Sequence, residues 1–154
     1  MGTIFPTIFY GSEGTIDHQL DPPIGGTGSL AYNFYFTSNL FAGAEVGFQF
    51  FPTYAENTLF IIPLGFRGGY QFNVGKFEFP IAAVIGMVWH RYLNLGYYGL
   101  YLKGSGSVFY RAFPNWSFGI NTSWYWYPQW IKDDSSKDVY GNMIDITLSA
   151  RYHF

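Results

Sequence analysis

The sequence predicts an all-β fold: an eight-stranded antiparallel up-and-down transmembrane β-barrel that forms one domain over residues 1–154. Side chains alternate in character with a period of two along most of the chain, which is typical of strands rather than helices. Charged residues make up 12% of the sequence and aromatic residues 23%, which is too little charge for an ordinary water-exposed surface. No apolar run reaches the roughly 18 residues that a transmembrane helix needs.

The last predicted strand shows the alternation most clearly. One face is wholly apolar and consists of Ile144, Ile146, Leu148, Ala150, Tyr152 and Phe154. The other face is polar or charged and consists of Asp145, Thr147, Ser149, Arg151 and His153. The same period predicts six strands upstream, over residues 29–36, 40–50, 60–72, 77–90, 100–111 and 116–127. An eighth strand is predicted over residues 3–10, where Pro6 indicates an edge or a bulge.

The predicted connections alternate in length. Short turns are expected at residues 37–39, 73–76 and 113–115, and longer loops at residues 11–27, 51–58, 91–99 and 128–142. Short periplasmic turns and longer extracellular loops are typical of outer-membrane barrels. The start, Met1-Gly2-Thr3, has neither the basic nor the apolar region of a secretory signal. We therefore expect the sequence to represent a mature chain with Met1 as an added initiator.

The residue types on each face predict which face points outward. The polar faces carry mostly small polar residues and sparse charge, which suits a crowded interior where charges must pair. The apolar faces are broad and aromatic, which suits contact with lipid. The predicted lumen charge network consists of Glu45, Arg67, Glu78, Lys103, Arg111, Asp145 and Arg151. Room for these larger side chains is expected beside the inward glycines Gly43, Gly47, Gly65, Gly69, Gly86 and Gly119.

Aromatic residues near the strand ends predict a girdle at the two membrane interfaces. Its predicted members are Trp89, Tyr92, Trp116, Trp124 and Trp126.

With these features the chain resembles the eight-stranded outer-membrane proteins of diderm, Gram-negative bacteria, namely the OmpA membrane domain, OmpX and OmpW families. Residues 147–154 are similar to the β-signal that the barrel assembly machinery reads, through Thr147, Ser149, Tyr152 and Phe154. Ser149 stands where that signal usually has glycine. The resemblance implies a location in the bacterial outer membrane, with the lipid bilayer and the assembly machinery as partners.

Two interpretations of the lumen charges remain open. Symmetric hairpins would place Glu45 opposite Arg67 and Gln71 opposite Glu78, which favours a plug of paired charges and a structural or interaction role. The alternative is a narrow porin-like channel, or a binder of small or hydrophobic solutes as the OmpW resemblance allows. The net charge of −2 predicts no nucleic-acid partner, and without cysteine there is no disulfide framework. No cofactor or metal is expected.

An enzyme that modifies lipid A is a second alternative, because two enzyme families, the lipid A palmitoyltransferases and deacylases, share this barrel size. Their chemistry needs a serine activated by a base near the outer rim. His90 lies near the outer end of its strand, but no serine neighbours it, and Ser107 and Ser123 fall in mid-strand. His18 and His153 belong to opposite ends of the barrel. The prediction is therefore that the protein is not an enzyme.

The predicted outer loops carry an acidic excess, which we interpret as a solvated surface. The acids are Glu13, Asp17, Asp21, Glu56, Asp133, Asp134 and Asp138, against Lys132 and Lys137. The spacing of Asp133, Asp134 and Asp138 does not match an EF-hand. A protein partner at the periplasmic or extracellular rim is left open, with Tyr97, Tyr98 and Trp130 as aromatic contacts.

Overall fold

The computed structural model describes residues 1–11, 14–15, 24–52, 58–92, 95–129 and 139–154. Within these ranges the side chains are described except at residues 5–11, 14–15, 52, 91–92, 95–97, 129 and 139–140. The strands are β1 (Gly2–Gly11), β2 (Gly14–Thr15), β3 (Gly25–Tyr35), β4 (Leu40–Pro52), β5 (Thr58–Val74), β6 (Phe77–Tyr92), β7 (Leu95–Phe113), β8 (Trp116–Gln129) and β9 (Val139–Tyr152). No helix in the described part of the chain is long and apolar enough to cross a membrane.

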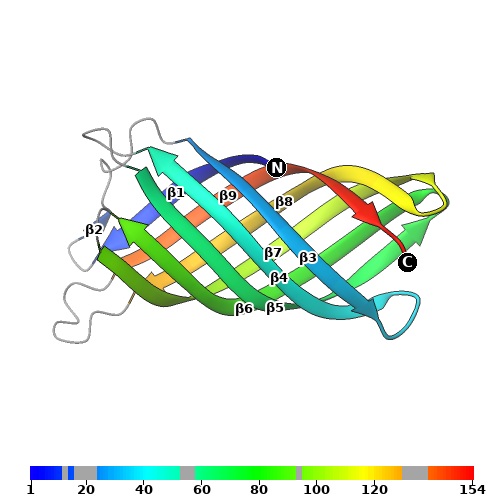
Figure 1. The fold of residues 1–154 in the computed structure, drawn as a ribbon, viewed down its shortest axis with the longest axis horizontal. Helices are drawn as coiled ribbons and strands as arrows, with labels where there is room; N and C mark the ends of the chain where they lie inside the picture. The colour runs from blue at the N-terminus through cyan, green and yellow to red at the C-terminus, as the bar shows by residue number, and fades with distance from the viewer. Residues whose placement is uncertain (12–13, 16–23, 53–57, 93–94, 130–138) are drawn as a thin grey trace.

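Eight of these strands form a closed antiparallel ring (Figure 1). Neighbours follow the order β1-β3-β4-β5-β6-β7-β8-β9, and β1 pairs with β9 to close it. The short β2 folds back on the end of β1, where Tyr10 pairs with Thr15. The predicted eight-stranded up-and-down barrel is confirmed.

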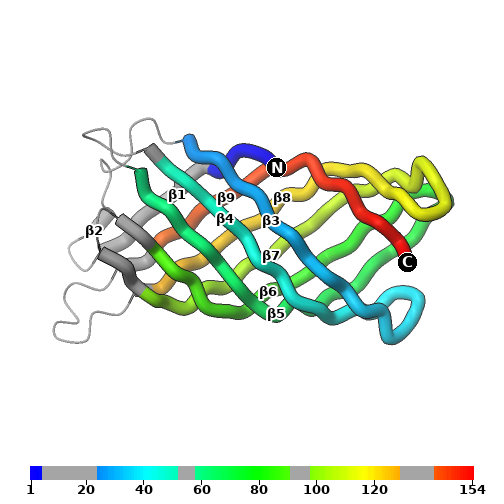
Figure 2. Tube along the Cα trace, in the orientation of Figure 1, coloured from blue at the N-terminus to red at the C-terminus, as the bar shows by residue number. Residues whose placement is uncertain are grey.

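The three tight turns lie at one end of the barrel, which we call the turn rim; the opposite end is the loop rim (Figure 2). Strands β5 and β6 pair as far as Val74 and Phe77, and Gly75 adopts a positive φ of 62° that glycine tolerates without strain. Asn73 therefore lies opposite Glu78, so the predicted pairing of Gln71 with Glu78 is wrong: the turn is two residues long, which moves the register.

The expected long loop at residues 91–99 is also wrong. Backbone pairing between β6 and β7 continues to Tyr92 and Leu95, because the strand alternation extends into a segment that looked irregular in sequence. The predicted first strand at residues 3–10 is present as β1, and its register shifts between Pro6 and Ile8. A proline at such an irregularity removes no regular ladder hydrogen bond.

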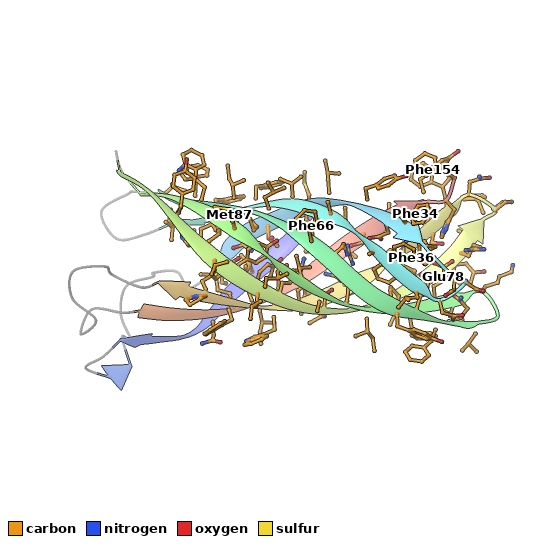
Figure 3. All side chains as sticks on the ribbon, turned by 90° about the horizontal axis from the view of Figure 1, so that it is seen from below. Phe34, Phe36, Phe66, Glu78, Met87 and Phe154 are labelled. Carbon is orange, nitrogen blue, oxygen red and sulfur yellow. The ribbon has the colours of Figure 1, made fainter. Side chains whose placement is uncertain are left out.

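The two faces of the strands point as the sequence predicts. The alternating apolar side chains point outward around the ring, and Phe34, Phe66 and Met87 project from the barrel in Figure 3. Leu30 and Phe66 are each 78% exposed, whereas the inward Glu45 and Glu78 are 5% and 3% exposed. The exterior of this barrel is apolar, and its interior holds buried polar and charged side chains together with buried apolar ones, unlike a water-soluble sheet protein with a polar exterior.

Inward glycines give the space that larger side chains occupy. A Cβ atom at Gly65 would lie 2.8 Å from the hydroxyl of Tyr101, and one at Gly69 would lie 2.7 Å from the ring of Phe41. Gly65 and Gly86 face each other across β5 and β6. Glycines, which have no side chain, therefore lie next to large inward side chains, and this arrangement lets the large side chains fit in the narrow lumen of an eight-stranded barrel.

Adding one methyl group at Gly86 is expected to destabilise the barrel. Its Cβ would lie 2.2 Å from the carbonyl oxygen of Leu64, which is backbone and cannot rotate away. Gly86→Ala should lower the free energy of unfolding by about 1–3 kcal/mol, measured by urea titration in detergent. Gly104→Ala is the control, because its Cβ would meet nothing within 4 Å. Equal effects of the two substitutions would contradict the close approach.

Candidate functional site: the charged lumen

The first group of lumen charges, the central cluster, consists of Glu45, Arg67 and Lys103. Strand β4 carries the acid, and β5 and β7 carry the bases. Arg67 Nη1 lies 3.2 Å from Glu45 Oε2, and Lys103 Nζ donates a hydrogen bond to Glu45 Oε1. Glu45 pairs across the ladder with Gly65 rather than with Arg67, so the predicted contact forms along a diagonal. The side chains of Arg67 and Lys103 are 12% and 4% exposed, so this carboxylate neutralises charge that is largely buried.

The second group, the rim cluster, gathers around Glu78 near the turn rim (Figure 3). Arg111 Nη2 lies 2.6 Å from Glu78 Oε1, and Arg151 Nη1 lies 3.2 Å from Glu78 Oε2. Arg151 also donates to Gln71 Oε1 at 2.6 Å, and its guanidinium lies 4.4 Å from the centre of the Phe109 ring. One buried carboxylate thus binds two arginines from different strands.

Asp145, the third predicted acid, has another environment. It is 2% exposed, and the Tyr125 hydroxyl donates a hydrogen bond of 2.7 Å to its Oδ2. Among the described residues no lysine or arginine forms an ion pair with it. The seven predicted network residues therefore divide into two ion clusters and one carboxylate bound by tyrosine.

Sequence reasoning missed an aromatic layer on the loop-rim side of the central cluster. Tyr101 and Tyr127 stack with ring centres 6.1 Å apart, and Tyr125 and Tyr127 at 5.8 Å. The Tyr127 hydroxyl donates to Gln49 Oε1 at 3.0 Å. This tyrosine layer packs with the buried apolar side chains Ile4, Phe51, Ile61, Val84, Val88 and Met143. The signal was present in the sequence, because all three tyrosines occupy inward positions of the alternation.

A cavity of about 670 Å³ lies between the two ion clusters. It reaches Arg67 and Lys103 at its inner end and Arg151 toward the turn rim. Its remaining wall comes mainly from residues 29–35 of β3 and from residues 149–154, which are the last part of β9 and the two residues after it. The lining therefore holds three bases against the single acid Glu45.

His90 does not form the arrangement that an acyl-transfer enzyme needs. The ring is 7% exposed, lies edge-on to Tyr127 at 5.8 Å, and its Nε2 has no hydrogen-bond partner among the described residues. The sequence did not anticipate that Ser117 Oγ lies 2.9 Å from His153 Nε2. Glu78 Oε1 lies 3.6 Å from this same Nε2, whereas in a catalytic triad the acid binds the Nδ1 of the histidine. Ser117 is also fully buried. The group lacks the geometry of an activated, reachable nucleophile.

The predicted girdle and assembly-signal residues occupy both ends of the barrel. Trp116 packs edge-on against Tyr152 at 5.1 Å near the turn rim, and Tyr152 packs against Phe154 at 5.0 Å. Trp124 is 47% exposed on the outer face. Trp89 and Trp126 are half-buried on β6 and β8, and the Tyr92 side chain lies outside the described residues. Of the signal residues, Thr147 points inward and Ser149 lines the cavity.

The predicted acidic loop surface lies outside the described residues. This applies to Glu13, Asp17, Asp21, Glu56, Lys132, Asp133, Asp134, Lys137 and Asp138, and also to His18 and Trp130. Within the described ranges, no group of three acidic or histidine side chains has the geometry to hold a metal ion.

Fold and lumen together define an eight-stranded antiparallel β-barrel with an apolar exterior and a charged, partly filled interior. A family model whose description names no activity matches residues 1–152, and the chain belongs to that family. An uncharacterized protein of Treponema pallidum (strain Nichols) is 30% identical over 132 residues, 84% of this chain and 59% of that protein. The chain thus spans about three-fifths of this curated relative.

A solved structure shares the fold. The crystal structure of Neisserial surface protein A matches with a TM-score of 0.64 at 11% sequence identity. The match covers 99% of this chain and 94% of that one. The likeness extends over the whole barrel and concerns its architecture.

Removing the Glu78 carboxylate is expected to destabilise the barrel, because it leaves Arg151 partly buried without its anion. Glu78→Gln should lower the free energy of unfolding by about 3–5 kcal/mol. A double-mutant cycle with Arg151→Gln should give a coupling of about 1–3 kcal/mol. The same cycle with Lys103→Gln is the control, because Lys103 belongs to the central cluster. Similar coupling in both cycles would contradict two separate clusters.

Acidification is expected to weaken the barrel through His153, which follows the end of β9. Burial lowers the pKa of His153 in the folded chain; Glu78 opposes this shift, and Arg111 and Arg151 add to it. The unfolded chain therefore takes up the proton first, near its ordinary pKa of about 6.5, so stability is full above that pH and falls as the pH drops through it. The loss ends below the folded pKa.

The measurement is the urea midpoint between pH 8 and pH 5, compared with that of His153→Gln. The difference between the two profiles isolates His153 from the other titrating groups. Parallel profiles would show that His153 titrates alike in the folded and unfolded chains.

Proposed function

We propose that the protein is an integral β-barrel of a bacterial outer membrane with a structural or interaction role. The observation that carries this proposal is the continuous apolar exterior of a closed ring. In hydrocarbon every backbone N–H and C=O needs a partner within the protein, and only helices and closed barrels meet this requirement. Exposed outward side chains such as Leu64, Phe66, Ile85 and Leu148 suit lipid and would be a liability in water.

The filled lumen supports a role without free conduction. The tyrosine layer and the central cluster occupy successive levels of the interior, and their large side chains are buried. A porin-type channel instead leaves an aqueous path along the barrel axis. The proposed partners are the lipid bilayer and, through residues 147–154, the barrel assembly machinery.

The test of this proposal is folding with and without an amphiphile. The chain should give a β-rich circular dichroism spectrum and a heat-dependent shift in gel mobility only in detergent micelles or lipid vesicles. A stable β-fold in plain buffer would overturn the membrane proposal, because the exterior would then have to be a water-exposed surface.

Binding of a small anionic solute is a second candidate, which the cavity favours. In its wall Arg67 and Lys103 share the single carboxylate of Glu45, which leaves one positive charge in excess, while Arg151 is paired with Glu78. The porin-like alternative predicts single-channel conductance in planar bilayers. The binder predicts retention of a solute without conductance.

An arginine on the outer face is expected to destabilise the barrel more when its position lies deeper in the bilayer. Ile120 is 53% exposed on the outer face and pairs with Val108 and Leu148 in the middle of its neighbours. Ile120→Arg should lower the free energy of unfolding from lipid vesicles by about 2–4 kcal/mol, as should Ala83→Arg. Val74→Arg, beside a tight turn, is the control and should have an effect of about 0–1 kcal/mol. Equal effects would mean that these positions share one environment.

A further inference from the structure

The cavity between the two ion clusters has a base toward each end. On the turn-rim side Arg151 Nη1 donates to Gln71 Oε1 at 2.6 Å and lies 3.3 Å from the Tyr35 hydroxyl. Tyr35 donates to the same Gln71 oxygen at 2.7 Å, so this layer crosses the barrel from β9 to β3. On the loop-rim side the cavity reaches Arg67 and Lys103 of the central cluster. The cavity is thus a length of lumen between two positively charged layers.

Each ion cluster brings two bases to one acid. Glu45 contacts Arg67 and Lys103, and Glu78 likewise contacts two arginines, one of which is Arg151. Each cluster therefore carries one positive charge in excess, and the cavity lies between the two clusters. Because a buried charge without a counter-charge is costly, a negative group in the cavity is favoured.

Arg67 and Arg151 are the lining bases that a solute can reach best. Their side chains are 12% and 14% exposed, whereas that of Lys103 is 4% exposed. Asp145 is not a lining residue, and its carboxylate accepts a hydrogen bond from Tyr125. Guanidinium groups bind the oxygens of a carboxylate or a phosphate through paired N–H donors. The two ends of the cavity therefore suit two anionic groups.

The wall between the two ends is neutral and can form hydrogen bonds. Ser105, Ser107 and Asn121 line the cavity from β7 and β8. Ser107 pairs with Asn121 across the ladder and donates to its Oδ1 at 2.7 Å, and both side chains are half-buried. Pairing between β7 and β8 is regular from Leu102 to Arg111, so this wall belongs to a continuous part of the ring. Hydroxyl and amide groups both donate and accept, which suits the hydroxyl groups of a solute.

The strand geometry gives the distance between the two ends. Arg67 and Gln71, the partner of Arg151, are both inward residues of β5 and lie four positions apart. At about 3.3 Å per residue this separation is about 13 Å. Hydrogen bonds of about 3 Å at each end leave about 7 Å between the two anionic groups. A chain of about six carbon atoms joined by bonds of about 1.5 Å spans this length.

We propose that the cavity binds a hydroxylated dianion with a chain of about six carbon atoms. One anionic group lies at Arg67 and the other at Arg151, with hydroxyl groups along β7 and β8. The volume of about 670 Å³ is in the range of small-molecule sites. This inference rests on the second candidate function, binding of an anionic solute, and names the class of that solute.

The test compares compounds that share a six-carbon chain. D-glucarate has a carboxylate at each end and hydroxyl groups between; adipate lacks the hydroxyls, gluconate lacks one carboxylate, and sorbitol lacks both carboxylates. Each is titrated into the full chain folded in zwitterionic micelles, and binding is measured by equilibrium dialysis. Glucarate should bind most tightly, adipate and gluconate about tenfold or more weakly, and sorbitol not measurably. Each comparison removes hydrogen bonds that the cavity would otherwise form.

Substitution of the two arginines locates the bound solute. Arg67→Gln and Arg151→Gln each leave one base on the acid of their cluster, and each should weaken glucarate binding by about tenfold or more. Each should also remove most of the difference between glucarate and gluconate, because the second carboxylate has lost its partner. The matched control is Lys76→Gln, since Lys76 is an exposed base at the turn rim that does not line the cavity. This control should leave the affinity unchanged.

The possible outcomes separate the inference from the proposals beneath it. Equal affinity for glucarate, adipate and gluconate would reject the solute class and leave an anion-binding lumen in place. An equal loss of glucarate binding in the Lys76 and arginine variants would assign the binding to the charge of the rim and overturn the proposed site. Absence of binding by all the compounds would overturn both this inference and the second candidate. The comparison of compounds uses the unsubstituted chain, so it decides the solute class even where a variant fails to fold.

Discussion

The structure depends on ring closure, the requirement that each strand find a hydrogen-bonding neighbour on both sides. Closure couples the first and last strands, β1 and β9, and fixes the strand number on which the lumen width depends. At eight strands the interior is filled mainly by side chains, apart from the cavity of about 670 Å³. Inward side chains must therefore fit against one another, and the glycines Gly65 and Gly69 stand beside the large side chains of Tyr101 and Phe41.

Within that narrow interior, the two ion clusters are in contact with aromatic rings, since Lys103 lies over Tyr125 and Arg151 over Phe109. Glu45 and Glu78 each bind two bases from other strands, so the clusters connect strands that are not ladder neighbours. Toward the loop rim the tyrosine layer packs with apolar side chains. Buried ion pairs contribute little net stability by themselves. They disfavour other strand registers, because a shifted register would leave a buried charge unpaired. The clusters thus complement the backbone ladder in specifying one arrangement of the strands.

The sequence predicts the architecture well because period-two alternation reports directly on the two faces of a strand. The inward or outward position of Ile144, Asp145 and Glu45 follows from that alternation alone. Contacts are harder to predict, because register depends on turn length. Because the turn at Gly75 has two residues, Asn73 rather than Gln71 lies opposite Glu78. The Ser117–His153 contact joins the start of β8 to the chain end, which local patterning does not reveal.

The pairing of β1 with β9 has a consequence for the order of events in biogenesis. The ring closes between residues 2–11 and 139–147, so the contact that completes the fold spans nearly the whole chain. Such non-local pairing is slow, because the entropy of a long loop is lost before the contact forms. A chain that emerges from its amino end cannot complete the barrel until synthesis has finished. Until that contact forms, the other strands lack the closed ring that pairs their backbone groups and orders their apolar faces.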